Sequence, residues 1–397
     1  MKSFVLAGSL LCAGIGSSSD AQVCTGQVGW WRFDGDVLDS SGLGNNGVFF
    51  GGVPNFVAGV HGQALELDGL DDFVRVANAP SLNPSAGLSL VAWARIRPYS
   101  GSGSDPIIDK AYFSHSYPYY QYQLGVSGSQ YPNVHQSISF VASTSAGNVG
   151  GGTPALTYAT DQWCFVVGTY DGEDCRFYFN GQLFSTYTLA GTISNFGSPV
   201  QFGKFNNLGF HLPAALDDIR IFERAISADE VTALYVNPEG AAAVLPAQSG
   251  ICAGGTVTLR AAHLQSASPA YVWKLDGNTL ANGTLPDGTT VSGTGTASLT
   301  LSGLYGSAIR AITCEVTSCA GSATTPVATV RVCASDFNCD GAVDDSDFVD
   351  FAGAYNMLLC DDPSMPPGCP SDLNRDGLVD DSDFVLFAAA YNDLLCS

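Results

Sequence analysis

Two acidic stretches near the C-terminus have the residue types and spacing of a divalent-cation site. Residues 336–347 (DFNCDGAVDDSD) and 372–383 (DLNRDGLVDDSD) carry oxygen-bearing side chains at positions 1, 3, 5, 9 and 12, with glycine at position 6. Calcium prefers six to eight oxygen ligands, and the glycine allows the sharp turn that wraps a chain around the ion. Because the whole pattern occurs twice in one register, the sequence predicts two calcium ions here.

The predicted ligands follow from the loop positions, with position 7 contributing its backbone carbonyl. In the first loop they are Asp336, Asn338, Asp340, Ala342, Asp344 and Asp347. In the second loop they are Asp372, Asn374, Asp376, Leu378, Asp380 and Asp383.

Each loop is followed by a segment with helical periodicity, 348–356 (FVDFAGAYN) and 384–392 (FVLFAAAYN). Steps of three and four residues place aromatic side chains on one face of each predicted helix. These side chains are Phe348, Phe351 and Tyr355 in the first copy and Phe384, Phe387 and Tyr391 in the second. We expect the two faces to pack together, so that loss of metal unfolds the segment.

Aspartate at position 12, with no helix before either loop, resembles the dockerin module over residues 336–396. The cysteines at 339, 360, 369 and 396 make the segment similar to a dockerin variant that serves as a C-terminal anchor on secreted bacterial proteins. The resemblance implies a calcium-dependent module at 335–397 that binds a cohesin-like or other envelope anchoring partner. In dockerins a Lys-Arg pair follows the loop, whereas this chain has Phe, Val, Ala and Tyr there.

Composition limits the number of domains, the classes of binding partner and the secondary structure that the chain can have. A length of 397 residues predicts two or three domains. With 15 Lys plus Arg against 37 Asp plus Glu, the chain is a poor partner for nucleic acid or anionic membranes. The 46 glycines and a charged fraction of only 13% favour short strands with tight turns over long helices.

Residues 1–21 have the features of a secretory signal peptide. Lys2 supplies the positive end, residues 4–15 are apolar, and 19–21 (SDA) form a small-x-small cleavage site. The apolar run is too short to span a membrane, and no other stretch is long and apolar enough. The sequence predicts a mature chain that is secreted, extracellular or at the cell surface.

Residues 24–236 alternate apolar and polar side chains over short runs such as 63–68, 73–76 and 88–96. A hairpin is predicted from 163–170 and 175–181, with its turn at Asp171-Gly172. This pattern indicates an antiparallel β-sandwich.

Five separated motifs in this segment resemble the laminin G-like, concanavalin A-like jelly roll: 30–34 (WWRFD), 67–74 (LDGLDDFV), 168–172 (GTYDG), 178–181 (YFNG) and 216–222 (LDDIRIF). The resemblance implies a non-catalytic domain that binds glycans or proteins, or acts as a spacer. A polysaccharide or a cell-surface glycoprotein is the expected partner, with cell adhesion as the expected role.

In this family the first and last strands pair, which would bring Asp34 and Asp39 towards Asp217. The resemblance therefore implies a third calcium in the jelly roll, with these side chains as ligands. The alternative is that they cap backbone N–H groups in turns.

The stretch 112–122 (YFSHSYPYYQY) is rich in tyrosine. We predict Tyr117, Tyr119, Tyr120 and Tyr122 as ligand-binding residues, because flat aromatic faces stack on sugar rings. Tyrosines are also common on sheet edges and in loop cores, so a structural role is the alternative.

Glu66, Asp68 and Asp71 have some likeness to the paired carboxylates of jelly-roll glycosidases. The spacing fits an ordinary laminin-like turn better, so we predict no catalytic residues. A polysaccharide-acting enzyme and a purely structural surface protein remain the alternative functions.

Residues 247–333 follow a linker and resemble an immunoglobulin-like domain, with Trp273 as its buried tryptophan. Cys314 matches the usual cysteine of one sheet, but the position opposite it is Ala261. The overall prediction is a mainly β chain: a jelly-roll sandwich, an immunoglobulin-like sandwich and a small α-helical calcium-loop module at the C-terminus.

Twelve cysteines in an exported chain indicate disulfides. Eleven belong to the predicted mature chain, which leaves one free thiol or an intermolecular bond. The candidate pairs are Cys339 with Cys396, Cys360 with Cys369, and Cys252 with Cys333.

Overall fold

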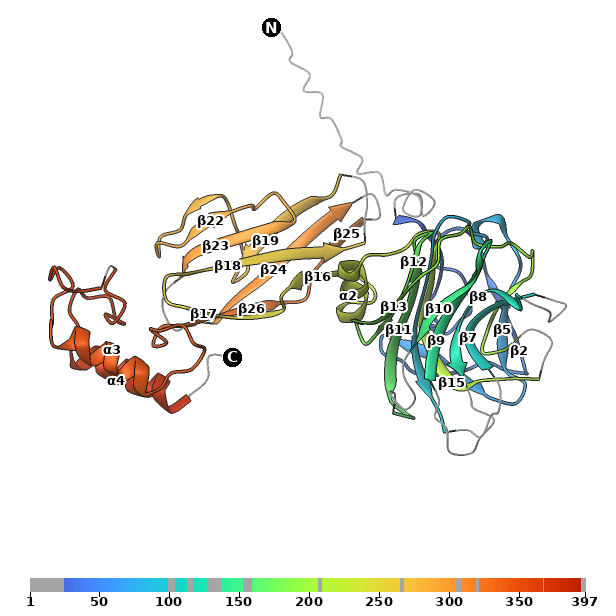
Figure 1. Cartoon of the computed structure of the whole chain (residues 1–397), viewed down its shortest axis with the longest axis horizontal. Helices are drawn as coiled ribbons and strands as arrows, with labels where there is room; N and C mark the ends of the chain where they lie inside the picture. Colours follow the sequence, from blue (N-terminus) through green and yellow to red (C-terminus); the bar gives the residue numbers. More distant parts are fainter. Residues whose placement is uncertain are drawn as a thin grey trace, which may run out of the picture. The chain divides into compact units, whose positions relative to one another are not determined.

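The computed structural model describes residues 25–98, 104–112, 118–127, 137–152, 159–205, 209–264, 268–304, 309–318, 321–366 and 368–393. The predicted signal peptide, Tyr117 and Cys396 lie outside these residues. The chain forms two compact units, one mainly before residue 226 and one mainly after it (Figure 1). Within the described ranges, no helix has the length and apolar character needed to cross a membrane.

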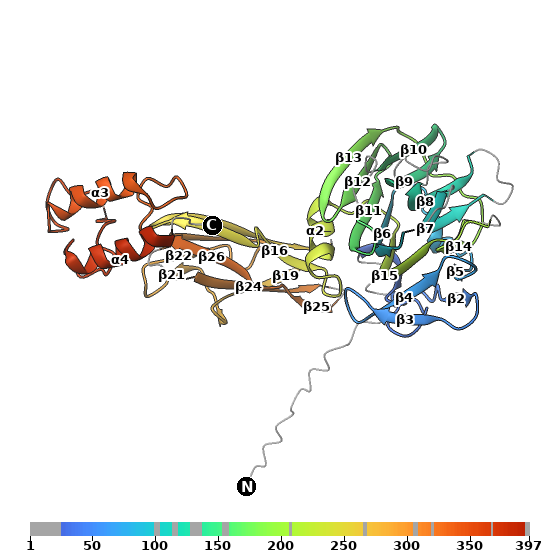
Figure 2. The same ribbon diagram turned by 90° about the horizontal axis from the view of Figure 1, so that it is seen from below.

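The first unit contains two large sheets that form two layers (Figure 2). Eight strands make the first sheet: β1 (Gln27–Trp31), β3 (Asn55–Ala58), β4 (Gln63–Asp68), β6 (Leu88–Ile96), β11 (Trp163–Tyr170), β12 (Asp174–Phe179), β13 (Gln182–Thr188) and β15 (Pro213–Phe222). Their order is β13-β12-β11-β6-β15-β4-β3, and β1 pairs with β15. The predicted pairing of first and last strands is therefore confirmed.

Seven strands make the second sheet: β2 (Gly47–Phe50), β5 (Phe73–Val76), β7 (Ser104–Ala111), β8 (Tyr120–Ser127), β9 (Ser137–Thr144), β10 (Gly147–Gly152) and β14 (Val200–Phe202). Their order is β10-β9-β8-β7-β14-β5-β2. A short 3₁₀ helix, η1 (Pro80–Leu82), follows β5.

Strand alternation explains how this second sheet joins the core. The cross-strand partners Val74, Phe202, Ile108, Leu124 and Phe140 form one registered row, and all five are fully buried. Because side chains alternate between faces, their sequence neighbours point to the outer face of the sheet.

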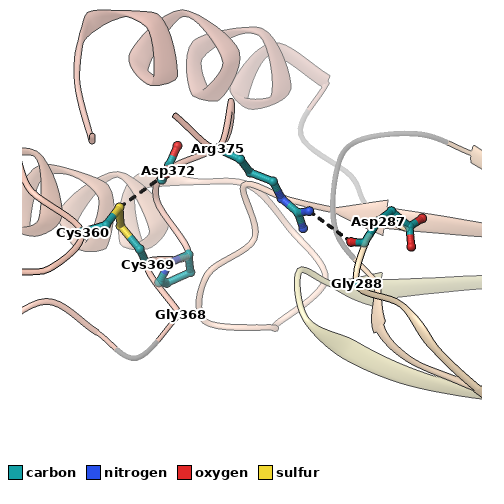
Figure 3. Close-up of a pocket in the computed structure, with 8 residues that line it drawn as sticks. Asp287, Gly288, Cys360, Gly368, Cys369, Asp372 and Arg375 are labelled. Carbon is teal, nitrogen blue, oxygen red and sulfur yellow. Dashed lines mark hydrogen bonds between the residues drawn. A yellow bond between two sulfur atoms is a disulfide. The ribbon is translucent and has the colours of Figure 1, made fainter. Parts of the chain in front are cut away.

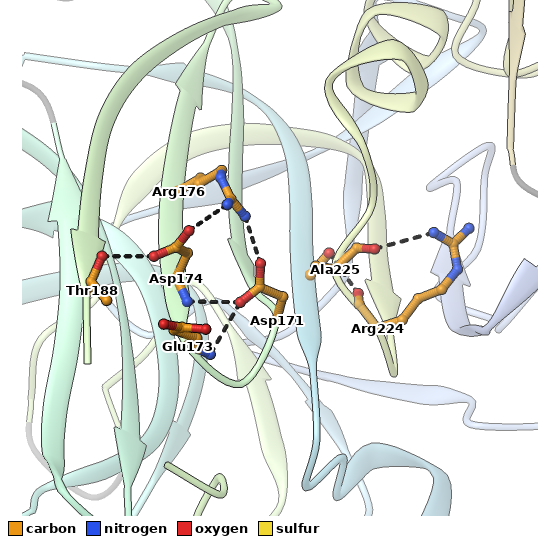
Figure 4. A network of polar contacts seen from close by, with 8 residues as sticks. Asp171, Glu173, Asp174, Arg176, Thr188, Arg224 and Ala225 are labelled. Carbon is orange, nitrogen blue, oxygen red and sulfur yellow. Dashed lines mark hydrogen bonds and ion pairs between the residues drawn. The ribbon is translucent and has the colours of Figure 1, made fainter. Parts of the chain in front are cut away.

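The predicted hairpin is confirmed as β11 and β12, and polar contacts fix its turn (Figure 4). Asp171 accepts hydrogen bonds from the backbone N–H groups of Glu173 (3.1 Å) and Asp174 (2.7 Å). Arg176 forms ion pairs with both Asp171 (2.7 Å) and Asp174 (2.5 Å). The aspartate side chain satisfies turn N–H groups that the strands leave unpaired.

The second unit begins with α2 (Ala228–Val236), which starts with a capping box between Ser227 and Glu230. Two smaller sheets follow. One contains β16 (Ala242–Leu245), β18 (Gly255–His263), β23 (Ser298–Leu304), β22 (Thr290–Ser292) and β21 (Gly283–Thr284), in that order. The other contains β17 (Gln248–Cys252), β26 (Ala328–Cys333), β24 (Ile309–Ser318), β19 (Ala270–Leu275) and β20 (Asn278–Thr279), with β25 (Gly321–Thr324) paired to β24.

Trp273 is fully buried between these sheets, as predicted. Cys314 is a buried free thiol in the same core as Ala261, so the usual inter-sheet disulfide is absent at this pair. The immunoglobulin-like family assignment of this sandwich stays a prediction.

The unit ends with α3 (Asp345–Tyr355) and α4 (Asp381–Asp393). The predicted fold class, mainly β with a jelly roll and a helical C-terminal piece, is confirmed.

Candidate functional site

Each acidic loop is closed by its last aspartate. Asp347 is fully buried, and its carboxylate accepts hydrogen bonds from the N–H groups of Phe337 (2.7 Å), Asn338 (3.2 Å) and Asp344 (3.0 Å). Asp383 is also fully buried and makes the equivalent bonds in the second loop, to Leu373, Asn374 and Asp380. Position 12 therefore joins the two ends of each loop around a buried negative charge.

The first aspartate of each loop faces the same interior. Asp336 is nearly buried and accepts hydrogen bonds from the N–H groups of Asp340 (3.2 Å) and Gly341 (3.1 Å). Burial, together with the charge of Asp347, raises the pKa of Asp336. Two buried carboxylates that repel each other are stabilised by a cation. Asp372 makes the equivalent two bonds, to Asp376 and Gly377.

The middle ligand positions are also held by the loops themselves. Asn338 donates to Asp340 (3.1 Å), and Asp340 accepts from the N–H of Ala342 (2.9 Å). Asp344 accepts from the N–H of Ser346 (2.8 Å) as the N-cap of α3. The same bonds recur from Asn374 to Asp376, from Leu378 to Asp376, and from Ser382 to Asp380.

The described His, Cys, Asp and Glu side chains form two groups of three whose ligand atoms lie within 4.8 Å of one another. Asp372 of the second loop belongs to one group, with Cys360 and Cys369, and Asp68, Asp71 and Asp72 form the other. The type and order of the oxygen donors fit calcium, and calcium binding by these loops stays a prediction.

The two helices pack through the predicted aromatic faces. The Phe351 and Phe387 rings stack with centroids 5.1 Å apart, and Phe384 and Phe348 contact the facing ring at 6.1 and 6.0 Å. Phe337, at loop position 2, stacks on both Phe351 (6.4 Å) and Phe387 (6.0 Å). The loops and the helix interface thus share one core, which is why loop disruption is expected to loosen the helices.

Two disulfides lie beside the loops. Cys360 bonds to Cys369, which confirms that predicted pair. Cys252 bonds to Cys339, so the predicted pairs Cys339–Cys396 and Cys252–Cys333 are wrong. Cys252 and Cys333 do lie opposite each other on the parallel strands β17 and β26, but loop 1 brings Cys339 to 5.6 Å from Cys252, between Cα atoms.

Three cysteines, Cys164, Cys175 and Cys314, are free and buried within the described residues. The odd cysteine count alone predicted one free thiol or an intermolecular bond. Burial raises the pKa of each thiol to about 12. Such thiols stay protonated and unreactive at neutral pH.

A recess of about 530 Å³ lies beside the second loop (Figure 3). Asp372 and the Cys360–Cys369 disulfide line one side, and Arg375 donates a hydrogen bond to the Asp287 carbonyl (3.4 Å). The cysteines and Asp372 form one of the three-residue groups within 4.8 Å. Because both sulfur atoms are in the disulfide, this group lacks the thiolates of a zinc site.

In the jelly roll, Asp34 and Asp217 hold two sides of one turn. Asp217 accepts hydrogen bonds from the N–H groups of Val60 (2.8 Å) and His61 (3.2 Å), and Asp34 accepts one from Gln63 (2.8 Å). Asp217 Oδ1 is buried without a hydrogen-bond partner among the described residues. Burial, with the charge of Asp218, raises the pKa of Asp217 to about 7. An unsatisfied buried carboxylate oxygen fits a calcium ligand.

Asp39 does not join this pair. Its carboxylate accepts hydrogen bonds from the N–H groups of Trp30 (3.0 Å), Ser41 (2.8 Å) and Asn45 (2.9 Å) and from the Ser41 hydroxyl (2.8 Å). These donors contact both oxygens, so the structure favours the turn-capping alternative over the metal-ligand role predicted for Asp39. It caps the turn-rich loop instead.

A polar row on the outer face of the seven-stranded sheet was not predicted from the sequence. Arg75, Gln201, Asp109 and Gln123 are successive cross-strand partners, so their side chains share this face. Gln123 donates to the fully buried Asp109 carboxylate (3.1 Å). These side chains alternate with core residues along each strand, but the strand pairing that aligns them cannot be read from the sequence.

The row continues through Val141 to Gly150, where a pocket of about 500 Å³ lies over the edge strands. Its lining includes Tyr120, Ser139, Val141, Asn148, Gly150, Gly152 and Tyr187. Since two of these residues are glycines, part of the floor is backbone. The tyrosines add aromatic faces, and the serine and asparagine add polar groups.

Only part of the predicted tyrosine platform belongs to this pocket. Tyr120 lines it, and burial, with the charges of Asp109 and Tyr119, raises the pKa of the Tyr120 hydroxyl. Tyr119 is 39% exposed, and its ring lies 6.4 Å from that of Tyr120. Tyr122 is fully buried and donates to the Leu82 carbonyl (3.1 Å), so its predicted role in ligand binding is wrong. Alternation along β8 points it into the core.

The carboxylates considered for catalysis have structural partners. Glu66 forms ion pairs with Arg97 and Arg95 and accepts a hydrogen bond from Asn55. Asp68 accepts hydrogen bonds from the N–H groups of Leu70, Asp71 and Asp72 across its turn. These contacts match the laminin-like turn that the sequence indicated.

Comparisons with solved structures give matches of low sequence identity. The chain is similar to domain 4 of AbnA, an extracellular arabinanase from Geobacillus stearothermophilus, with 17% identity, 53% of this chain and 99% of that one covered, and a TM-score of 0.43. It is also similar to the binding domain of Paraclostridial Mosquitocidal Protein 1, with 13% identity, 74% and 75% of the two chains covered, and a TM-score of 0.43. The binding domain of Botulinum neurotoxin DC gives 14% identity, 75% and 73% coverage, and a TM-score of 0.41.

No curated protein sequence matches the chain. A family model, described as the concanavalin A-like lectin/glucanases superfamily, matches residues 68–232. These residues span most strands of the two large sheets, including every strand that lines the pocket. Residues 68–232 of this chain are a laminin G-type, concanavalin A-like jelly-roll domain.

Proposed function

We propose that this chain is a secreted, non-catalytic recognition protein whose jelly roll binds a polysaccharide or the glycan of a cell-surface glycoprotein. The pocket over β8, β9 and β10 carries the proposal. It combines two tyrosine rings, a glycine floor and hydrogen-bonding groups, which is the chemistry that holds a sugar ring. The lectin/glucanase family match of residues 68–232 supports this assignment.

The C-terminal segment is proposed to hold two calcium ions and to bind a cohesin-like or other envelope anchoring partner. The duplicated loop network and the shared aromatic core support it, since each loop repeats the same hydrogen bonds. A third calcium is proposed at Asp217 and Asp34 in the jelly roll. The disulfides Cys252–Cys339 and Cys360–Cys369 support export, because such bonds persist in oxidising compartments.

A glycan array followed by affinity electrophoresis of the full chain tests the recognition role. Tyr120→Ala and Tyr187→Ala are each expected to weaken binding about tenfold, because an aromatic contact is worth roughly 1 to 1.5 kcal/mol. Leu183→Ala is the matched control, since Leu183 is an exposed apolar residue on the same strand as Tyr187 and lies outside the pocket.

Two results would overturn the proposal. Release of reducing sugar by the purified chain would favour a polysaccharide-acting enzyme. An array without binding above background would favour a purely structural surface protein.

A further inference from the structure

Three basic side chains converge around Phe73, on the same sheet face as the pocket but near its other end. The Lys204 ammonium lies 4.2 Å from the centroid of the Phe73 ring. The Arg75 guanidinium lies 5.4 Å from that centroid and 4.8 Å from the centroid of Phe50. The His211 ring lies 6.1 Å from Phe73, and Lys204 and His211 are backbone bridge partners. Five strand steps, about 24 Å, separate Arg75 from Gly150 in the pocket.

The two cations, Arg75 and Lys204, have no acidic partner in contact within the part of the chain that the structure describes. Arg75 and Lys204 form no ion pair or side-chain hydrogen bond within the described ranges. The Arg75 Nε and His211 Nε2 atoms are buried and lack a hydrogen-bond partner there. Buried donors are nearly always satisfied in native proteins, so the unpaired Arg75 Nε–H is suited to an acceptor that comes from a ligand.

The cluster also repels itself. Burial and the charge of Arg75 lower the pKa of Lys204. Burial and the charge of Lys204 lower the pKa of His211, while its contact with the Gly209 backbone and the charges of Asp71 and Asp68 oppose that shift. An anion between the three side chains would relieve the repulsion.

A neighbouring acidic turn carries Asp68, Asp71 and Asp72, and the charges of Asp68 and Asp71 act on His211. Among the described residues, none of these carboxylates forms an ion pair with Arg75 or Lys204. The Asp68 carboxylate is occupied by three backbone N–H groups of its own turn. Asp72 accepts a hydrogen bond from the N–H of Asp68. Concentrating three basic residues here is unusual for a chain with only 15 Lys plus Arg against 37 Asp plus Glu.

We propose that Arg75, Lys204 and His211 form a binding site for the anionic group of an acidic sugar, either a carboxylate or a sulfate ester. Arginine offers paired N–H donors to such a group, and lysine adds a point charge. Phe50 stacks on Phe73 at 4.7 Å and is 37% exposed, so it presents an aromatic face to the sugar ring. This site is separate from the tyrosine pocket.

The net charge of the whole chain restricts the class of polysaccharide that this site can bind. A formal net charge of −22 repels a dense polyanion, while the local cluster attracts a single anionic group. The site therefore suits a largely neutral polysaccharide that carries isolated acidic residues.

Affinity electrophoresis of the full chain tests this with matched polymers: glucuronoxylan and its carboxyl-reduced form, and a sulfated galactan and its desulfated form. One native polymer is expected to bind at least about tenfold more tightly than its uncharged form. The uncharged form binds more weakly because it cannot form the charge-assisted hydrogen bond. The polymer pair that shows this difference identifies the anion as carboxylate or sulfate.

Lys204→Gln and Arg75→Gln are each expected to abolish that preference without changing affinity for the uncharged polymers. Lys274→Gln, which removes one positive charge from the second sandwich, is the control. This variant should keep the preference for the native polymer. Arg75 packs on two rings, so the melting temperature of each variant is measured to detect unfolding. If Arg75→Gln unfolds, Lys204→Gln still tests the site, because Lys204 is partly exposed.

Equal affinity for native and uncharged polymers would overturn the anion site, even if Tyr120→Ala still weakened binding to both. Tighter binding to a poly-aspartate peptide than to either native polymer would also overturn it, in favour of an acidic peptide ligand. Weaker binding of every polymer by Tyr120→Ala, with its preference for the native over the uncharged forms retained, would support two separate sites.

Discussion

The Tyr355 hydroxyl, at the end of α3, donates a hydrogen bond of 2.6 Å to the Asp381 carboxylate in the other loop–helix repeat. The reciprocal bond runs from Tyr391 to Asp345, at 2.5 Å. Each helix therefore contacts the loop of its partner repeat next to a predicted calcium ligand. The two loops are linked through these tyrosines as well as through the aromatic core between the helices.

Removing one of these hydroxyls is expected to weaken calcium binding in the opposite repeat. Tyr355→Phe should lower the affinity of the second loop, because Asp381 starts the helix that also carries the ligand Asp383. Isothermal titration of the full chain with calcium measures this. Tyr235→Phe, in α2, is the control, and unchanged titrations in Tyr355→Phe would show that the bond does not couple the loops.

Replacing the last aspartate of a loop is expected to remove one ion. Asp347→Asn and Asp383→Asn should each lower calcium affinity about tenfold or more, because a buried ligand charge is lost. At a calcium concentration of 100 times Kd, one intact site adds about 2.7 kcal/mol to stability. Calorimetry with calcium and with chelator measures the effect, and Asp350→Asn, an exposed change on α3, should resemble the unmodified chain. An identical melting temperature with calcium and with chelator would contradict both loop assignments.

In the jelly roll, substitution of Asp217 and of Asp39 is expected to have different effects on calcium binding. Asp217→Asn should reduce the number of bound calcium ions by one, since Asp217 supplies the buried oxygen without a partner. Asp39→Asn should leave the ion count unchanged and lower only the melting temperature, because Asp39 caps a loop. Equilibrium dialysis counts the ions. A loss of one ion in Asp39→Asn, with none lost in Asp217→Asn, would reverse the assignment.

Lys110 gives the first unit a pH dependence. It is fully buried, donates to Asn78 (2.7 Å) and to the Ser198 carbonyl (2.5 Å), and burial lowers its pKa to about 8. An unfolded lysine keeps its proton to about pH 10.4. Between these values the unfolded chain binds more protons, so stability rises with pH, by roughly 3 kcal/mol in total.

Thermal melts of the unmodified chain and of Lys110→Met between pH 7 and 10 check this. The stability of the unmodified chain relative to the variant should increase through that range. A difference that stays constant with pH would show that the pKa of Lys110 is not lowered by burial.

Local patterns in the sequence predicted the two C-terminal helices correctly. Loop spacing, the glycine turn and the three- and four-residue steps that place Phe351 and Phe387 are properties of consecutive residues, so they can be read without a fold. Contacts between distant segments could not be read in this way. Cys339 had three cysteines within its own module as candidate partners, but its bond goes to Cys252, 87 residues earlier.

The direction of a side chain from its strand was a second feature that the sequence did not predict. Tyr120 and Tyr122 belong to one tyrosine-rich run, but Tyr120 lines the pocket and Tyr122 is fully buried. The pairing of β8 with β7 shifts register between these two tyrosines, so simple alternation does not hold there. The register between paired strands was a third such feature. Arg75, Asp109, Gln123 and Gln201 are far apart in the chain and become a row only because four strands pair in one alignment.

The sequence by itself determined the strand and helix types, the jelly-roll motifs and the repeated donor order of the acidic loops, because each depends on spacing within a short stretch. Tertiary structure alone decided that Asp39 caps a loop while Asp217 leaves an oxygen unsatisfied. It also decided that three basic residues from separate segments meet around Phe73. Burial and cross-strand pairing set both outcomes, and neither is a property of any short stretch of the chain.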